Sequence, residues 1–259
     1  MIERIVIRDN ENTPVHYLSD LKAFKNGTEY VFKEGVNVIV GKNGCGKTTL
    51  MKLIQVYLLV GQQQCEEKNV SDLFDSFKLK DEVKMLDGVD VYADYERNVF
   101  RLAHPDEYKG ERGLGLQSFA NFGALGLMYQ SSTGEGVTVA LNNLWKLMFS
   151  ESAELKFPKI SGWQLEKYGS YLDYVKTHKV KGDEWTILMD EPDRNLDIEK
   201  IGSIKEILSF HKPQTQVIAV VHNPLLIVAL SRNPEVNIIE MTNGYVKKVT
   251  KLVNELVKK

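Results

Sequence analysis

The segment GKNGCGKT at residues 41–48 constrains this chain more than any other part of its sequence. It has the phosphate-loop pattern of a glycine, four residues, then glycine, lysine and threonine. Glycines in this pattern let the backbone curl until successive N–H groups point at phosphate oxygens. The pattern requires a strand before it and a helix after it. Residues 36–40 are a short apolar run typical of a buried parallel strand, and residues 49–59 have apolar side chains at helical spacing. The segment therefore predicts a phosphate-binding loop rather than a chance glycine-rich turn.

Each residue type in such a loop has its own task. The pattern predicts that Lys47 reaches the β- and γ-phosphates of a nucleotide and that the Thr48 hydroxyl ligates magnesium. The helix that follows directs the positive end of its dipole at the same anion. We therefore expect ATP and Mg²⁺ as ligands, with the nucleotide held by Gly41, Lys42, Asn43, Gly44, Cys45, Gly46, Lys47, Thr48 and Thr49.

The composition is that of an ordinary globular protein. Of the 259 residues, 43% are hydrophobic and 26% are charged, and the net charge of −2 gives no overall attraction to nucleic acid or anionic membranes. No apolar run approaches the roughly 20 residues that cross a bilayer. The N-terminal residues alternate like a strand rather than a signal peptide, and the two cysteines fit a reducing compartment. We expect a cytoplasmic protein without a membrane partner.

Strand and helix patterns alternate along the chain and predict an α/β fold, with a mostly parallel sheet flanked by helices and an antiparallel β element. Strands are expected at 2–8, 29–32, 36–40, 185–189 and 216–221, and helices at 49–59, 137–149, 198–210 and 224–230. Two hairpins are expected, one from 89–95 and 98–103 and one from 236–240 and 245–250. We expect a single domain over 1–259. Its core lobe comprises 1–60 and 185–259, and 61–184 forms the first hairpin and a helical lobe with an insertion near 150–184.

Three polar side chains follow two further predicted strands. Asp190 comes directly after an apolar run, where a carboxylate can hold magnesium. Glu191 is one residue on, so its side chain points elsewhere and can polarise an attacking water. His222 ends the run at 217–221 and could donate a hydrogen bond to the γ-phosphate. Parallel sheets bind ligands at the carboxyl ends of their strands. This position favours the functional roles over the alternatives, in which Asp190 and Glu191 are only a charged strand end and His222 is a structural residue.

Together these motifs resemble those of the ABC-class ATPases. Residues 41–48, Asp190, Glu191, 195–197 and His222 look like that class's P-loop, magnesium acid, base, D-loop and switch histidine. The stretch 32–44 is similar to the non-transporter branch, which includes the SMC and RecF kinds and bacterial defence ATPases. The resemblance covers roughly 1–60 and 185–245. It implies an ATP hydrolase with an ABC ATPase head-like fold, with Glu191, Lys47 and His222 as catalytic residues and Asp197 among those that bind the nucleotide.

The resemblance also implies a site shared between two chains. Residues 131–136 precede a predicted helix and resemble the signature that caps the γ-phosphate of a partner's ATP, through Ser132, Gly134 and Glu135. The alternative is a simple helix cap without a partner. The signature would make the protein an ATP-dependent, head-to-tail homodimer. Gln117 is a candidate for the family's glutamine loop, although nothing in the local sequence fixes it.

The spacing of the motifs separates this chain from two relatives. Between Gly136 and Asp190 lie 53 residues, more than a standard transporter ATPase needs, and no coiled coil points to a true SMC protein. The expectation is a compact ATPase that drives or gates a DNA-repair or phage-defence complex with a protein effector. An ATP-dependent assembly switch and a transporter subunit are the alternatives. DNA binding is possible through Lys176, Lys179 and Lys181, but a solvated face explains these lysines better.

Overall fold

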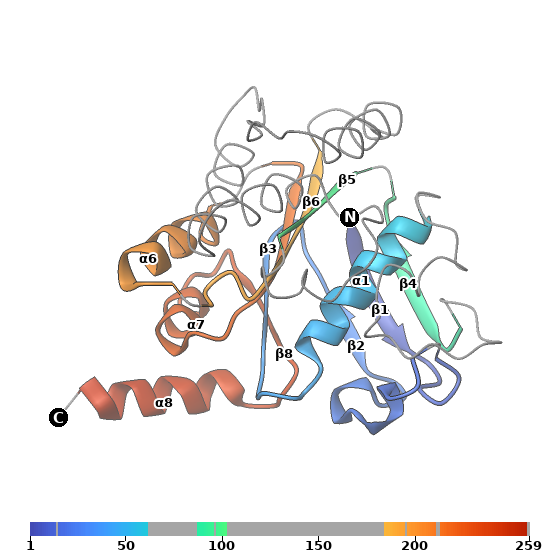
Figure 1. The fold of residues 1–259 in the computed structure, drawn as a ribbon, viewed down its shortest axis with the longest axis horizontal. Helices are drawn as coiled ribbons and strands as arrows, with labels where there is room; N and C mark the ends of the chain where they lie inside the picture. Colours follow the sequence, from blue (N-terminus) through green and yellow to red (C-terminus); the bar gives the residue numbers. More distant parts are fainter. Residues whose placement is uncertain are drawn as a thin grey trace, which may run out of the picture.

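The computed structural model describes residues 1–13, 15–61, 87–95, 97–102, 184–194, 196–210 and 213–257. Their strands form two sheets, a five-stranded one in the order β5-β6-β7-β3-β8 and a three-stranded one in the order β2-β1-β4 (Figure 1). In the larger sheet the strands are β3 (Gly35–Val40), β5 (Asn98–Leu102), β6 (Trp185–Asp190), β7 (Thr215–Val220) and β8 (Asn237–Glu240). Every neighbouring pair in it is parallel, which confirms the predicted α/β class.

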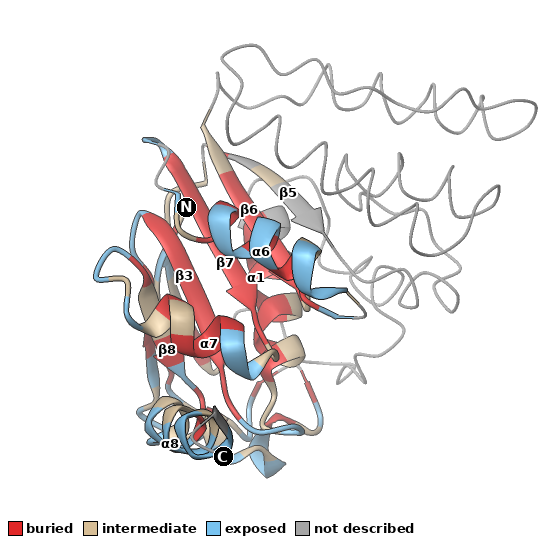
Figure 2. Ribbon diagram, turned by 90° about the vertical axis from the view of Figure 1, so that its left-hand side faces the viewer, coloured by how far each residue is buried: buried red, intermediate tan, exposed pale blue. Residues whose placement is uncertain are grey.

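The central strands of the parallel sheet are buried on both faces. All six residues of β3 and all six of β7 are buried, and Figure 2 shows them as a continuous buried layer. Their valines and isoleucines suit this position, because β-branched side chains pack well on a pleated surface that has no solvent side. The short apolar runs in the sequence therefore correspond to the core of the sheet.

Helices cover both faces of this sheet. α1 (Lys47–Gly61) packs on the face that carries Ile39 and Ile218. α6 (Ile198–Ile207) and α7 (Pro224–Ser231) pack on the opposite face, against Val38 and Val217. The alternation of strand residues between the two clusters follows directly from the two-residue period of a strand.

The three-stranded sheet lies on the other side of α1 (Figure 1). Its strands are β1 (Ile2–Ile7), β2 (Glu29–Val31) and β4 (Val89–Ala93), and both pairings are antiparallel. Two short 3₁₀ helices, η1 (Leu18–Asp20) and η2 (Lys22–Phe24), connect β1 to β2. Because α1 lies between two sheets, it is buried almost all round, and Tyr57 on it is fully buried.

One buried side chain joins the two sheets. The amide of Gln216, at the start of β7, accepts a hydrogen bond from Ile2 N at 3.0 Å and donates to Ile2 O at 2.7 Å and to Lys33 O at 3.1 Å. Gln216 has no exposed surface, so these bonds satisfy a polar group that would be costly to bury alone. The antiparallel sheet is thereby held to the end of the parallel sheet away from the phosphate loop.

The first predicted hairpin is wrong. The two strands exist, but β4 pairs antiparallel with β1, whereas β5 pairs parallel with β6 in the other sheet. The short link between Ala93 and Asn98 carries the chain from one sheet to the other. Alternating side chains show that a segment is extended, but they do not show which strand it pairs with, and both segments find partners far away in the sequence.

The second predicted hairpin is also wrong. β8 pairs in parallel with β3, and residues Tyr245–Val257 form the helix α8 instead of a returning strand. Gly244 has a φ of +68°, so the Asn-Gly pair does make a turn, but the turn leads into a helix. Val249 is buried and packs with Tyr245 and Val253, at the i, i+4 and i+8 spacing of one helix face. Contact with α7 decides the structure of this segment.

The remaining predictions for this part of the chain are confirmed to within one to two residues at the element ends, apart from a difference of three residues at the C-terminal end of α6. The predictions for 61–86 and 103–183, among them the helix at 137–149, the helical lobe and the insertion near 150–184, lie outside the described residues. The division of the chain into one domain with two lobes stays a prediction.

Candidate functional site

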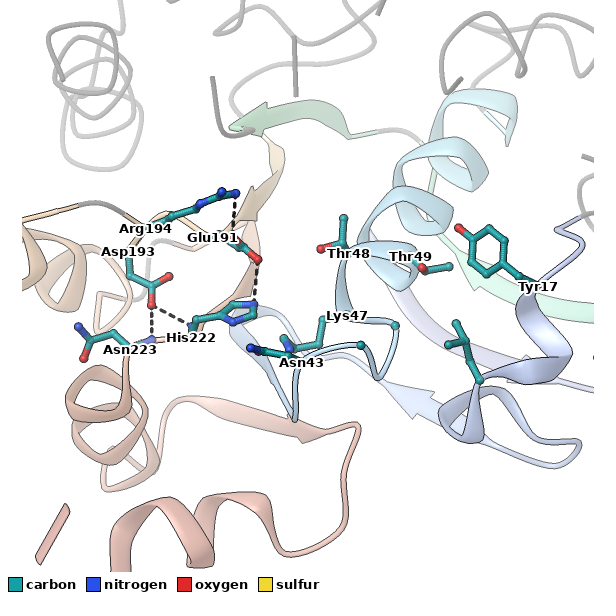
Figure 3. A pocket seen from close by; sticks show the side chains of 13 residues that line it. Tyr17, Asn43, Lys47, Thr48, Thr49, Glu191, Asp193, Arg194, His222 and Asn223 are labelled. Atoms are coloured by element: carbon teal, nitrogen blue, oxygen red, sulfur yellow. Dashed lines mark hydrogen bonds and ion pairs between the residues drawn. The ribbon is translucent and has the colours of Figure 1, made fainter. Parts of the chain in front are cut away.

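A cavity of about 720 Å³ lies at the carboxyl ends of β3, β6 and β7. It is lined by the phosphate loop, the first turn of α1 and the residues after β6 and β7 (Figure 3). Tyr17, just before η1, and Leu21, between η1 and η2, line it as well. Two of these strands are followed by residues that the sequence predicted to be catalytic, Glu191 after β6 and His222 after β7. The structure therefore brings together three motifs that lie far apart in the sequence.

The phosphate loop has the backbone that its glycines predict. Gly44 and Gly46 have φ values of +75° and +99°, in the left-handed region that favours glycine. A Cβ on Gly46 would lie 2.7 Å from Cε2 of Phe24, so a larger residue there would displace η2. The loop is thus shaped by its own glycines and seated on the segment between β1 and β2.

Lys47 is buried and bridges the loop that contains it. Its Nζ donates hydrogen bonds to Gly41 O at 2.9 Å and to Lys42 O at 3.0 Å. The ammonium group therefore sits in the curl of the loop, beside the N-terminus of α1, where an anion gains from both the charge and the helix dipole. Asn43, Gly44, Gly46, Thr48 and Thr49 also line the cavity, whereas Gly41, Lys42 and Cys45 belong to the loop without lining it.

Thr48 and Asp190 form a pair of oxygen donors. Thr48 Oγ1 lies 3.5 Å from Asp190 Oδ1, and Asp190 is only 2% exposed. An octahedral Mg²⁺ ion with ligands at about 2.1 Å places neighbouring oxygens about 3 Å apart, so a hydroxyl and a carboxylate at this spacing suit it. Among the described residues there is no cluster of three or more His, Cys, Asp or Glu side chains that could hold a metal. Mg²⁺ often has only one or two protein ligands, because it keeps water and phosphate ligands.

Glu191 and His222 are in direct contact. His222 Nε2 lies 3.0 Å from Glu191 Oε1. Glu191 has a φ of +50°, a backbone conformation that is uncommon for residues other than glycine and asparagine. This backbone turn directs Glu191 into the cavity while the adjacent Asp190 stays at the strand end, so the two neighbouring carboxylates have separate positions.

The environment of His222 favours its neutral form. Burial lowers the pKa of His222 below its ordinary value of 6.5, and the charge of Lys47 lowers it further, while Glu191 and Asp193 oppose these effects. The imidazole is therefore neutral at pH 7. A neutral imidazole leaves the Glu191 carboxylate as the basic group of the pair.

Asp193 is a site residue that the sequence reasoning missed. Its Oδ2 accepts hydrogen bonds from the backbone N–H groups of His222, at 2.9 Å, and of Asn223. This buried carboxylate therefore fixes the start of the loop after β7 relative to the loop after β6 (Figure 3). Asn223 is the N-cap of α7 and accepts from Leu225 N and Leu226 N. An asparagine before a proline is a helix-start signal that could have identified Asn223, but no local signal marks Asp193.

Two other lining residues also have no sequence signal. Arg194 Nη1 lies 3.4 Å from Glu191 Oε2, so both carboxylate oxygens of Glu191 have a partner. Tyr17, just before η1, lines the cavity on the side of Thr49, opposite the Glu191 and His222 side (Figure 3). The cavity thus has a charged side and an aromatic side.

Other predicted nucleotide-binding residues are not part of this cavity. Asp197 is the N-cap of α6, where its Oδ1 accepts from Lys200 N at 2.9 Å. Its contact with a nucleotide stays a prediction. Ser132, Gly134, Glu135 and Gln117 lie outside the described residues.

The described helices include none that is both long and apolar enough to span a bilayer. Lys176, Lys179 and Lys181, the lysines considered for DNA contact, lie outside the described ranges.

Comparison with solved structures finds three similar folds among others. One is a dimeric ATP-binding cassette in a post-hydrolysis state bound to ADP and Pi, with 17% identity, 85% of this chain and 86% of that chain covered, and a TM-score of 0.36. The SMC head domain from Thermotoga maritima has 17% identity, coverage of 88% and 91%, and a TM-score of 0.37. A bacterial Atm1-family ABC exporter with ATP bound has 12% identity, coverage of 98% and 42%, and a TM-score of 0.45.

The comparison with protein families is more direct. Residues 17–211, well over half of the chain, match the family described as AAA domain. This match and the placing of the motifs at one edge of a parallel sheet confirm the resemblance to ABC-class, SMC-like P-loop ATPases. The chain therefore belongs to the AAA domain family of P-loop ATPases.

Proposed function

We propose that this chain binds ATP with Mg²⁺ in the cavity beside the phosphate loop and hydrolyses it. The observation that carries the proposal is the convergence of three pairs of groups on one cavity. Lys47 and the loop amides suit an anion, Thr48 and the neighbouring Asp190 suit a magnesium ion, and Glu191 contacts His222. The family match supports a nucleotide as the ligand.

Each pair has a separate part in the reaction. Lys47 and the N-terminus of α1 stabilise the negative charge that gathers on the phosphates. Thr48 and Asp190 would hold Mg²⁺, which neutralises phosphate charge when it is bound. Glu191 accepts the proton of the attacking water. His222, neutral and beside Glu191, can donate a hydrogen bond from Nε2 to the γ-phosphate.

The nucleotide base has a candidate partner at the other side of the cavity. Tyr17 presents an aromatic ring beside Thr49, and aromatic faces stack on nucleotide bases. We propose that the base of ATP lies against Tyr17 while its phosphates reach the loop. This orientation follows the length of the cavity from its aromatic side to its charged side.

We further propose that hydrolysis occurs in a head-to-tail homodimer. The motif resemblance supports this arrangement, in which Ser132, Gly134 and Glu135 of a second copy cover the triphosphate and Asp197 contributes at the interface. By the same analogy the protein works in the cytoplasm, with a protein effector, in DNA repair or phage defence, and DNA is a possible partner.

One observation favours a second candidate function, an ATP-dependent assembly switch with slow turnover. Both oxygens of Glu191 have a charged or polar neighbour, His222 for one and Arg194 for the other, and the positive charge of Arg194 makes the carboxylate a weaker base. In a switch, ATP would hold a complex together and its hydrolysis would only reset the complex.

The substitution Glu191→Gln separates these functions. If the chain is a cycling ATPase, Glu191→Gln lowers phosphate release from ATP by roughly 100-fold or more and strengthens ATP-dependent dimerisation in light scattering. The exposed Glu199, on α6 outside the cavity, provides the control Glu199→Gln, which keeps normal turnover. Unchanged turnover in Glu191→Gln would rule out Glu191 as the base. A wild-type chain that dimerises with ATP but barely turns it over would favour the switch.

A further inference from the structure

Arg194 is a cavity-lining cation that none of the motifs includes. It lies four residues after Asp190, and its Nη1 is 3.4 Å from Oε2 of Glu191. Its side chain is 47% exposed, and in Figure 3 it extends across the Glu191 side of the cavity, away from His222. The residue therefore has an ion-pair partner inside the site and enough solvent around it to change position.

This ion pair is of a kind that is readily exchanged. A strong arginine–carboxylate pair has two parallel hydrogen bonds at about 2.7–2.9 Å, whereas here one nitrogen meets one oxygen at 3.4 Å. Exposed pairs of this kind contribute little to stability because water screens them and ordering two side chains costs entropy. Nothing in the contact itself holds Arg194 to Glu191 against a stronger acceptor.

The charges around the cavity indicate what that acceptor is. Among the described lining residues, the cations are Lys47 and Arg194 and the carboxylates are Glu191 and Asp193. Asp193 is already bonded to two backbone N–H groups, and Lys47 is fixed between two carbonyls of its own loop. Arg194 is therefore the lining cation that can exchange its partner, the Glu191 carboxylate, for another acceptor. A triphosphate would bring several negative charges to its side of the cavity.

We propose that Arg194 is a second cation for the triphosphate, which exchanges Glu191 for a phosphate oxygen when ATP binds. The guanidinium fork suits phosphate better than a single carboxylate oxygen, because it can donate two parallel hydrogen bonds to it. The exchange frees Oε2 of Glu191, the atom that would accept the proton of the attacking water. This inference rests on the proposed function and adds a nucleotide contact that also controls the base.

The test measures ATP affinity in the Glu191→Gln chain, where turnover is suppressed and the ion pair is already gone. In that chain we expect Arg194→Ala to raise the Kd for ATP with Mg²⁺ by about tenfold, measured by isothermal titration calorimetry. Arg194→Lys restores part of the affinity because it keeps the charge without the fork. Arg194→Ala also weakens the dependence of Kd on salt concentration, because one charge contact is lost.

The control is Arg8→Ala in the same background. Arg8 is a similarly exposed arginine with its own ion pair, to Asp90 at 2.8 Å in the antiparallel sheet, and its loss leaves the Kd unchanged. Arg194→Gln serves as a second variant if Arg194→Ala does not fold. An unchanged Kd in these Arg194 variants, in a chain whose ATP binding depends on Lys47, would overturn this inference alone. A wild-type chain that binds no ATP would overturn the proposed function with it.

Discussion

His222 Nε2 lies 3.0 Å from Glu191 Oε1, and this contact joins the carboxyl ends of the adjacent strands β6 and β7. It also joins the two residues that the proposed mechanism needs most, a base for the water and a neutral donor. The backbone N–H of His222 also donates a hydrogen bond to Asp193. The loop after β6 therefore contacts His222 at two points, through Glu191 and through Asp193.

The lowered pKa of His222 predicts a specific loss of stability in acid. The folded-state pKa lies below the ordinary value of 6.5, so as the pH falls the unfolded chain takes up the imidazole proton first. As the pH falls from about 6.5 to the folded-state pKa, the free energy of unfolding therefore decreases. Above about pH 6.5 the stabilisation from the neutral His222 is present in full. Denaturant unfolding at about pH 7.5 and about pH 5.5 measures it, and His222→Gln loses less stability over the interval than the wild type. Equal losses in the two chains would show that the pKa of His222 is not lowered on folding.

Removal of the Asp193 carboxylate should disturb the loop after β7. Asp193→Ala leaves the N–H groups of His222 and Asn223 without their acceptor, which costs about 2 kcal/mol in the free energy of unfolding and lowers the rate of ATP hydrolysis. Asp193→Asn keeps an acceptor oxygen and recovers most of both. If Asn were as harmful as Ala in denaturant unfolding, the charge of Asp193, rather than its acceptor oxygen, would be what matters.

Tyr17 should affect nucleotide affinity more than turnover. Loss of one aromatic stacking partner weakens binding of a base by about 1–3 kcal/mol, so Tyr17→Ala raises the Kd for ATP about tenfold, whereas Tyr17→Phe keeps it near the wild-type value. Calorimetric titration gives both values. Tyr92→Ala is the matched control, because Tyr92 is a partly exposed tyrosine in β4 that contacts Arg4 and does not line the cavity. A normal Kd in Tyr17→Ala would place the base elsewhere.

The link between the sheets predicts a large effect far from the site. Gln216→Leu leaves the N–H and C=O of Ile2 and the C=O of Lys33 without the amide, which lowers the free energy of unfolding by about 3 kcal/mol. The neighbouring Thr215 has a buried hydroxyl with no hydrogen-bond partner among the described residues. Thr215→Val therefore changes stability by less than about 1 kcal/mol. Similar losses in the two variants would mean that packing, rather than the amide bonds, holds this junction.

The sequence predicted those parts of the fold whose signals are local. The strands β3, β6 and β7 are short apolar runs, and they lead into the phosphate loop, Asp190 and His222, which the structure places at the cavity or beside it. The P-loop is recognisable because its glycines and Lys47 act within a few residues of one another. The centre of the parallel sheet follows from these runs and their order.

The parts that could not be predicted depend on contacts between distant residues. β5 finds its partner in β6, more than 80 residues later, and α8 is a helix because its apolar face meets α7. Asp193 has its role only because the fold brings the backbone of His222 to it, 29 residues further along. Arg194 and Tyr17 likewise become site residues through the shape of the cavity, which no motif describes.

If the phosphate loop holds ATP for hydrolysis, the reaction depends on Lys47. The measurement is phosphate release from ATP by the purified chain, with and without Mg²⁺, for the wild type, for Lys47→Ala and for Lys205→Ala, which alters an exposed lysine near the end of α6. We predict Mg²⁺-dependent release by the wild type and Lys205→Ala, and a loss on the order of 100-fold or more in Lys47→Ala. Equal release by wild type and Lys47→Ala, or no Mg²⁺-dependent release by the wild type, would contradict the account.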